Sequence, residues 1–138
     1  MNNGNKNTLL EQLESLLKDS DFEGVRLSLE SWIGDHEVDY FIVNDNKKNP
    51  ARGFVVEAAA VSGSVISTYS YIAGEQTYGT IMLKSLSSVT ASISKGSYIM
   101  LRLVTDSGLA YQMQFPAEKW EDIIIFKNNL ERSMKNIG

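Results

Sequence analysis

Three carboxylates recur at every second position of one short polar segment, an arrangement suited to holding a cation. Asp35, Glu37 and Asp39 would point to one side of an extended chain, with His36 among them. Carboxylate oxygens are the ligands that Ca²⁺ and Mg²⁺ prefer, but the spacing of an EF-hand loop is missing. We therefore interpret the segment as a solvated connection, and we expect no metal site and no cofactor.

Side chains for covalent catalysis are scarce. The chain has one histidine, His36, and no cysteine, so thiolate nucleophiles, sulfur-rich zinc sites and histidine pairs are excluded. Serines are plentiful, but the nearest approach to a G-x-S-x-G elbow is Val-Ser-Gly-Ser-Val at 61–65, which predicts a hairpin turn. No Walker loop or dinucleotide-binding glycine pattern occurs. We expect a protein that is not an enzyme.

Three cations lie in one polar segment that separates two predicted strands. Lys47, Lys48 and Arg52 could together hold a phosphate group. Modules that bind membranes usually carry many more basic residues, whereas this chain has 13 basic and 17 acidic side chains and a net charge of −4. An anionic ligand at these residues is therefore the alternative function, and any membrane contact would be peripheral.

Charge is distributed unevenly along the chain. Residues 1–39 carry three basic and nine acidic side chains, whereas residues 40–115 carry six basic and four acidic ones. An acidic N-terminal unit could bind a basic surface on another protein. Nucleic-acid binding is disfavoured because cations are sparse around the strand tyrosines that could stack on bases; these are Tyr69, Tyr71, Tyr78 and Tyr98.

Length and composition indicate one globular domain. The chain has 138 residues, of which 43% are apolar and 22% charged, so it can bury a core of ordinary size. No apolar run approaches the roughly 18 residues of a membrane span, and the first residues lack a secretory apolar region. We therefore expect a cytoplasmic protein.

The first third of the chain predicts helices. Residues 1–7 are polar and predict a disordered tail, and a helical extension should occupy residues 8–34. Thr8 and Glu11 have capping-box spacing ahead of leucines that recur at intervals of three and four. Residues 21–33 fit both a helix and a strand; we favour a helix that ends at Gly34, and a strand forming a hairpin with the next one is the other reading.

From Val38 onward, short β-branched and aromatic runs alternate with turn residues, which predicts strands. In the last predicted strand, side chains alternate between apolar and polar, as in an antiparallel sheet with one buried and one solvent-exposed face. The seven predicted strands are Val38 to Asn44, Gly53 to Val61, Val65 to Ile72, Tyr78 to Lys84, Ser87 to Ile93, Tyr98 to Thr105 and Leu109 to Phe115.

A long amphipathic helix is predicted to follow. Pro116 suits its first position, and acidic residues lie near its start with basic residues near its end. Residues three and four positions apart form one continuous stripe along this helix, which is apolar except for Lys127. The stripe comprises Trp120, Ile123, Lys127, Leu130, Met134 and Ile137, and Ile124, Ile125 and Phe126 widen its apolar surface.

This order of elements resembles the pleckstrin-homology superfold over residues 38–135. The segment from Ile81 to Val89 is similar to the bacterial PH-like and GRAM pattern, in which an apolar strand leads into an isoleucine-or-leucine, x, x, valine corner. The C-terminal part of the sequence is also similar to those domains: it has a strand, an Asp-Ser-Gly turn, a strand ending in Phe115 and a helix carrying Trp120. The resemblance implies an α+β fold in which residues 38–138 form a bent seven-stranded antiparallel sandwich or barrel. The C-terminal helix would cap one open end, with Trp120, Ile123 and Leu130 buried in it.

The resemblance implies a non-enzymatic module that binds another protein. As the alternative, it implies a phosphoinositide or other anionic ligand at Lys47, Lys48 and Arg52, because PH domains grip phosphoinositide phosphates in the loop between their first two strands. Such sandwiches often accept a peptide as an extra strand beside the C-terminal helix. The groove would run between Ser87 to Ile93 and the helix face Trp120 to Leu130, and its predicted binding residues are Val89, Ala91, Ile93, Trp120, Ile124, Ile125 and Phe126. A third reading is a small acidic inhibitor or accessory protein of a bacterium, phage or other mobile element, acting through residues 1–39. A homodimer through the helical stripe is compatible with each function.

Overall fold

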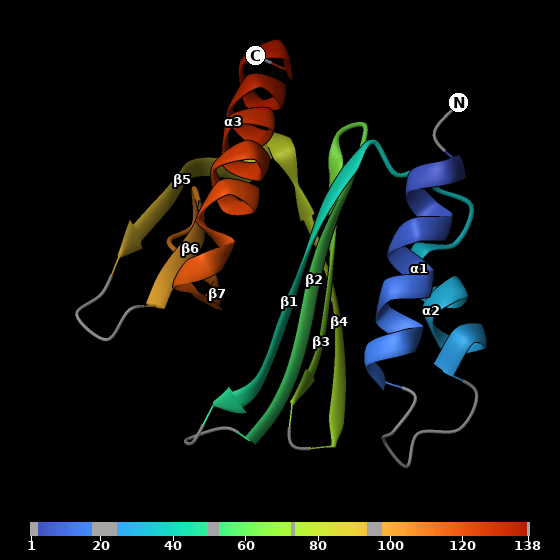
Figure 1. Ribbon diagram of the computed structural model, residues 1–138. Helices are drawn as coiled ribbons and strands as arrows, with labels where there is room; N and C mark the ends of the chain where they lie inside the picture. Colours follow the sequence, from blue (N-terminus) through green and yellow to red (C-terminus); the bar gives the residue numbers. More distant parts are fainter. Residues whose placement is uncertain (1–2, 18–24, 50–52, 73, 94–97, 138) are drawn as a thin grey trace.

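The computed structural model describes residues 3–17, 25–49, 53–72, 74–93 and 98–137 (Figure 1). Seven strands form two antiparallel sheets, and the fold is α+β, as predicted. Sheet A has the strand order β1-β2-β3-β4 and sheet B the order β5-β6-β7. No helix of the described residues is long and apolar enough to cross a membrane. The strands are β1 (Tyr40–Asn49), β2 (Gly53–Ser62), β3 (Val65–Ile72), β4 (Glu75–Met82), β5 (Leu86–Ile93), β6 (Tyr98–Thr105) and β7 (Ala110–Pro116).

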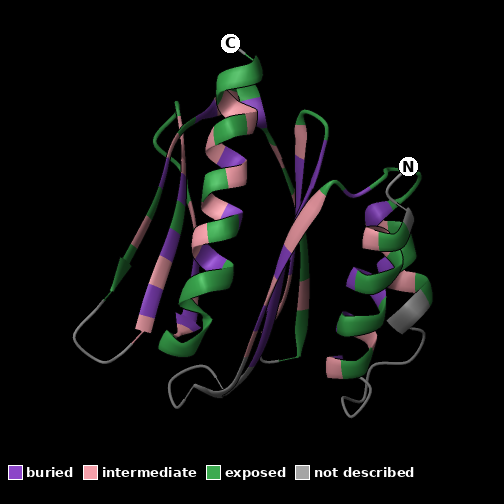
Figure 2. Cartoon of the chain, turned by 45° about the horizontal axis from the view of Figure 1, so that its top comes forward, coloured by how far each residue is buried: buried purple, intermediate pink, exposed green. Residues whose placement is uncertain are grey.

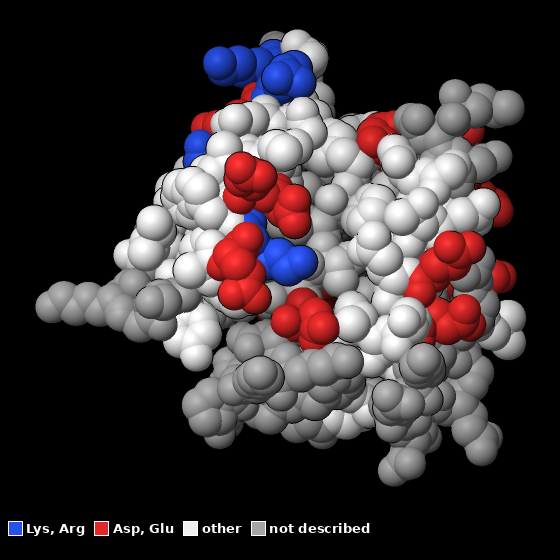
Figure 3. Space-filling view, viewed as in Figure 1, with Lys and Arg blue, Asp and Glu red and all other residues white. Residues whose placement is uncertain are grey.

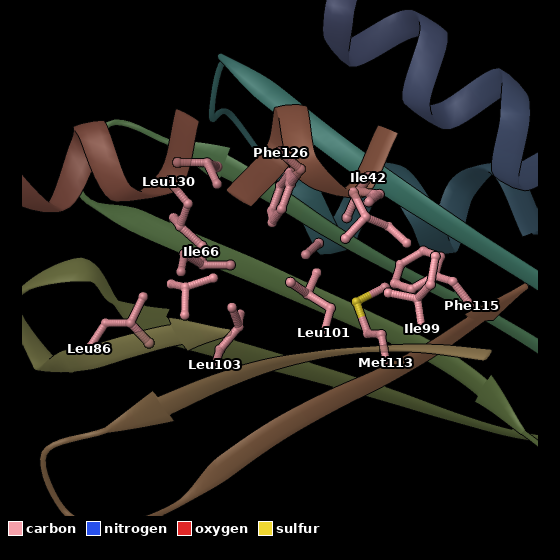
Figure 4. Packing of buried hydrophobic residues seen from close by; sticks show 14 of the residues in the cluster. Ile42, Ile66, Leu86, Ile99, Leu101, Leu103, Met113, Phe115, Phe126 and Leu130 are labelled. Atoms are coloured by element: carbon pink, nitrogen blue, oxygen red, sulfur yellow. The ribbon is translucent and has the colours of Figure 1, made fainter. Parts of the chain in front are cut away.

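The main core lies between the two sheets and under the C-terminal helix α3 (Trp120–Ile137). Figure 4 shows side chains from sheet A, sheet B and α3 directed into the same interior. Each large apolar side chain buried in this way stabilises the fold by about 1.5–3 kcal/mol. The helix residues that enter this core are Ile123, Phe126 and Leu130, and they meet Ile42 and Ile66 of sheet A and Leu101, Met113 and Phe115 of sheet B.

A second core covers the opposite face of sheet A. Helices α1 (Asn3–Leu17) and α2 (Val25–Ile33) pack there through leucines and Ile33. Successive residues of β2 alternate between the two cores: Ala59 and Val61 enter the main core, whereas Ala58 and Ala60 contact the helices. Burial on both faces explains why β2 is apolar at nearly every position. Figure 2 shows the buried residues of α1 on the side toward the sheet and the exposed ones on the outside.

Helix α1 begins earlier than the capping-box pattern predicts. Residues 3–7 belong to α1, whereas the prediction places them in a disordered tail. Thr8 is consequently inside the helix, where its hydroxyl donates to the Gly4 carbonyl oxygen at 2.8 Å and makes no cap. Two side chains anchor the early turns: the Asn5 amide donates to the Asp39 carbonyl oxygen and the Lys6 amine to the Gly34 carbonyl oxygen. The capping-box pattern is local in the sequence and so does not contain these long-range contacts.

Residues 25–33 are helical, so the preferred reading of this stretch is confirmed, and residues 18–24 lie outside the described part. Gly34 ends the helix in the left-handed region, with φ at 64°, and its N–H donates to the Glu30 carbonyl oxygen. Glycine adopts this conformation without a steric penalty, which explains why the helix stops there.

Strand positions follow the prediction more closely than strand ends. β3 and β6 have the predicted bounds, whereas β1 runs on through Lys47 and Lys48 to Asn49. Pro116 ends β7 and does not start the helix, because residues 117–119 form a separate 3₁₀ turn before α3. The expectation that Trp120 is buried is wrong: as the first residue of α3 it is 38% exposed, and Phe126 enters the core in its place.

Candidate functional site

The free edge of β1 lies in a furrow between two helices. β1 pairs with β2 on one side, and no strand of the described residues pairs with its other edge. In Figure 1 this edge runs down the middle of the molecule, with α3 on one side and α1 on the other. A strand with one unpaired edge presents backbone N–H and C=O groups that another chain can use.

The furrow consists of two adjoining hollows that share Gln12, Val43 and Lys119, and we call it the β1 groove. The first hollow, about 350 Å³, lies between β1 and α3; the second, about 450 Å³, lies along α1. The floor is formed by Tyr40, Phe41, Ile42, Val43 and Asp45. The α3 side adds Asp122, Ile125, Phe126 and Asn129, and the α1 side adds Thr8, Glu11, Ser15 and Leu16.

Tyr40 fixes the α3 wall of the groove to its floor. The Tyr40 hydroxyl donates to the Asn129 carbonyl oxygen at 3.2 Å and lies 2.6 Å from the Ser133 hydroxyl. Its ring meets the Phe126 ring edge-on at 5.7 Å. Burial raises the pKa of Tyr40 above the usual phenol value, which the hydrogen bond to Ser133 partly offsets. Tyr40 is therefore a neutral structural link at physiological pH.

Asn44 ties the lower part of β1 to the other sheet. Its side-chain amide donates to the Glu57 carboxylate and to the Gln114 carbonyl oxygen, both at 2.9 Å. Asn44 is only 1% exposed, and the two bonds replace water for its NH₂ group, whereas its Oδ1 atom has no hydrogen-bond partner within the described residues. The Asn44 contact brings β7 beside β1 and leaves the open part of the edge between α1 and α3.

Acidic side chains predominate along the groove. Among the described residues, its lining includes the acidic Glu11, Asp45 and Asp122 and one cation, Lys119. Figure 3 shows acidic groups on both sides of the central hollow, with a basic group between them. The Asp45 Oδ1 atom is buried and has no hydrogen-bond partner within the described residues. The carboxylates of Glu11 and Asp122 are exposed and are thus accessible to a donor that enters from outside.

The helix face predicted to border β5 is largely taken up by the main core. α3 packs directly against β5, and Val89 and Phe126 are buried in the main core, with Phe126 only 2% exposed. Ala91 is partly buried against the same core. Val89 and Phe126 are thus largely withdrawn from solvent, whereas Ala91 is partly exposed.

The remaining predicted residues are at least partly accessible. Ile93 and Trp120 are exposed, Ile124 is half-buried, and Ile125 is 60% exposed. Ile125 lines the β1 groove, where the edge of the buried Phe126 also contributes. Part of the predicted helix surface thus borders a groove, but on the β1 side of the helix.

The other candidate clusters do not form a described site. Lys47 and Lys48 lie in β1, but their side chains and the whole of Arg52 lie outside the described part of the chain, so the anionic-ligand site stays a prediction. The Asp39 carboxylate accepts a hydrogen bond from the Gly63 N–H at 2.8 Å, and Asp35, His36 and Glu37 are exposed. Among the described residues, no cluster of three potential metal ligands occurs.

Tyr40, Asn44 and the groove itself were not predicted. The pattern of β1 indicates a strand, but a strand order with β1 at an edge depends on pairing between distant segments. One signal in the sequence could have indicated Asn44. Tyr40, Ile42 and Asn44 are two residues apart and so share the inner face of the strand, where a polar residue is unusual.

A scan against protein-family models and searches of curated proteins and of solved structures return no match for this chain.

Proposed function

We propose that this chain is a non-enzymatic protein-binding module of PH-like architecture, whose β1 groove takes up a basic, extended segment of a partner protein. The PH-like assignment is supported by the order of elements and by a C-terminal helix packed between a four-stranded and a three-stranded sheet. The binding mode rests on one observation above all: β1 has an unpaired edge that lies in a groove.

An extended segment fits this edge because strand addition satisfies the backbone of both chains. Main-chain hydrogen bonds supply affinity, while alternate side chains of the guest point to opposite sides. Here one set would face Asp122 and Ile125 on α3 and the other Glu11 and Gln12 on α1. The guest strand would thus lie along β1 with α3 on one side and α1 on the other.

The charge of the lining argues for a basic guest. Of the residues that the structure describes, three carboxylates and one lysine border the groove, and the whole chain has a net charge of −4. Lysine and arginine side chains on an incoming strand would pair with Asp45 and Asp122, whereas an acidic strand would be repelled. A second copy of this acidic chain is a poorer guest for the same reason.

The test uses labelled peptides as probes. An octapeptide alternating lysine and valine should bind the full chain in fluorescence anisotropy, and one alternating glutamate and valine should not. Asp122→Lys should weaken lysine–valine binding on the order of fivefold, because it reverses an exposed charge contributing about 1 kcal/mol. Asp106→Lys, the same change in the exposed β6–β7 turn, is the matched control and should bind as the wild type does.

A second pair of probes separates strand addition from mere charge attraction. N-methyl groups on alternate amides of the lysine–valine peptide remove the donors along one of its edges. One of the two possible methylation patterns should abolish binding and the other should be tolerated. Equal binding of both methylated peptides, or an equal loss in Asp122→Lys and Asp106→Lys, would refute the proposal.

A further inference from the structure

Strand β4 forms the other free edge of sheet A, and this edge has almost no protection. β4 pairs with β3 along eight consecutive residues without a register shift, and no strand of the described chain pairs with its far side. Natural edge strands are usually guarded by lysine, proline or a bulge. β4 has none of these, and Glu75 at its first position is its only charged residue.

A hollow beside β4 leaves apolar side chains uncovered on the outer face of the sheet. We call it the β4 hollow: about 820 Å³ between α2 and β4, lined by Leu27, Ser28, Trp32, Ser67, Tyr78 and Thr80 among others. Leu27 is 73% exposed, and Tyr78 is also exposed although its hydroxyl hydrogen-bonds Ser28. An unguarded edge that adjoins exposed apolar groups is typical of an interface.

We propose that β4 pairs antiparallel with β4 of a second copy, so that two copies of sheet A join into one eight-stranded sheet. The pairing is isologous, because each copy offers the same edge and the two strands are related by a two-fold axis near Tyr78 and Gly79. The interface lies on the opposite edge of sheet A from the β1 groove and does not depend on the proposed function.

The geometry leaves space for the second copy and fills the β4 hollow. α2 packs over β3, so the α2 helices of the two copies would lie above strands three spacings apart, about 14 Å. A helix with its side chains is about 10–12 Å across. The two helices would therefore approach without collision, and Leu27 and Tyr78 from both copies would cover the apolar surface between them.

Electrostatics permit this pairing at β4 and favour it over β1. With the two-fold axis at Tyr78, Glu75 of each copy lies opposite Ile81 of the other, so the two Glu75 residues are six strand positions, or about 20 Å, apart. Their repulsion is screened, because the Debye length in physiological salt is about 8 Å. The β1 edge, by contrast, is bordered by Asp45, Asp122 and Glu11 and enclosed by two helices.

Sedimentation velocity over the micromolar concentration range tests the proposal. The wild-type chain should reach twice its mass of 15.4 kDa as concentration rises. A Thr77→Lys/Thr80→Lys variant places two lysines on exposed positions of β4 and should remain at the single-chain mass. The matched control, Thr90→Lys/Ser92→Lys, adds the same charge at exposed positions of the edge strand β5 and should dimerise as the wild type does.

Each outcome decides for or against the β4 interface. A wild-type chain that stays at 15.4 kDa throughout refutes the dimer. A dimer that survives the β4 lysines, or that the β5 lysines abolish, places the interface elsewhere and also refutes it. Peptide binding by the β4 variant in the anisotropy assay tests the β1 groove independently.

Discussion

The Tyr40 hydroxyl lies 2.6 Å from the Ser133 hydroxyl, so the first strand and the last helix are joined by residues 93 positions apart in the sequence. Because Tyr40 begins β1 and Ser133 lies in the C-terminal half of α3, this contact sets how far α3 stands from the free edge of β1. The width of the groove is therefore determined by a tertiary contact.

Replacing Tyr40 tests that link. Tyr40→Phe removes two hydrogen bonds and should lower the free energy of unfolding by about 1–2 kcal/mol, measured by urea denaturation. Ser133→Ala should cost less once Tyr40 is phenylalanine, with a coupling energy of about 1 kcal/mol in the double-mutant cycle. Strict additivity of the two substitutions would show that the hydroxyls do not interact.

Gly79 should be intolerant of any side chain. A Cβ atom at this position would come within 2.5 Å of the Thr68 Oγ1 atom on the paired strand. Gly79→Ala should therefore destabilise the protein by about 1–3 kcal/mol, because Thr68 is buried and its branched side chain is stiff. Gly4→Ala, in α1 with open space around it, is the control and should cause no loss. Equal midpoints of thermal unfolding for Gly79→Ala and the wild type would contradict the predicted clash with Thr68.

Stability should decline at alkaline pH because of Tyr69. Burial raises the pKa of Tyr69 above its usual value, so the folded protein keeps this phenol protonated where the unfolded chain ionises. The stabilisation is thus complete below about pH 10 and is lost as the pH rises above that value. Tyr69→Phe loses a hydrogen bond to Gln76 and should be less stable at neutral pH, but its unfolding free energy should fall less steeply above pH 10. Parallel pH profiles for the two proteins would exclude Tyr69 as the source.

The number and the positions of strands could be predicted because side-chain alternation and turn residues are local. β3 and β6 have the predicted bounds for that reason, and Gly34 correctly marks the end of α2. The start of α1 could not be predicted, since the contacts of Asn5 and Lys6 that hold its first turns are made with residues more than twenty-five positions away.

The site was less predictable than the fold. An apolar stripe on α3 indicates burial but not which neighbour covers it: Trp120 was expected to be buried and is 38% exposed, whereas Phe126, assigned to the binding surface, is 2% exposed. Similarly, β1 and β5 look alike as short strands, although β5 is covered by α3 and β1 borders a groove. Which edge is open depends on how the two sheets and the helices assemble, and sequence periodicity does not contain that information.

The placement of sheet A between two cores has a practical consequence for anyone shortening the gene. α1 and α2 cover Val56, Ala58, Ala60 and Tyr69, which face away from the main core. A fragment starting at β1 would expose this hydrophobic face of the sheet to water and would be expected to aggregate. The leading helices are thus an integral part of the folded body, and trimming them is a poor route to a smaller working unit.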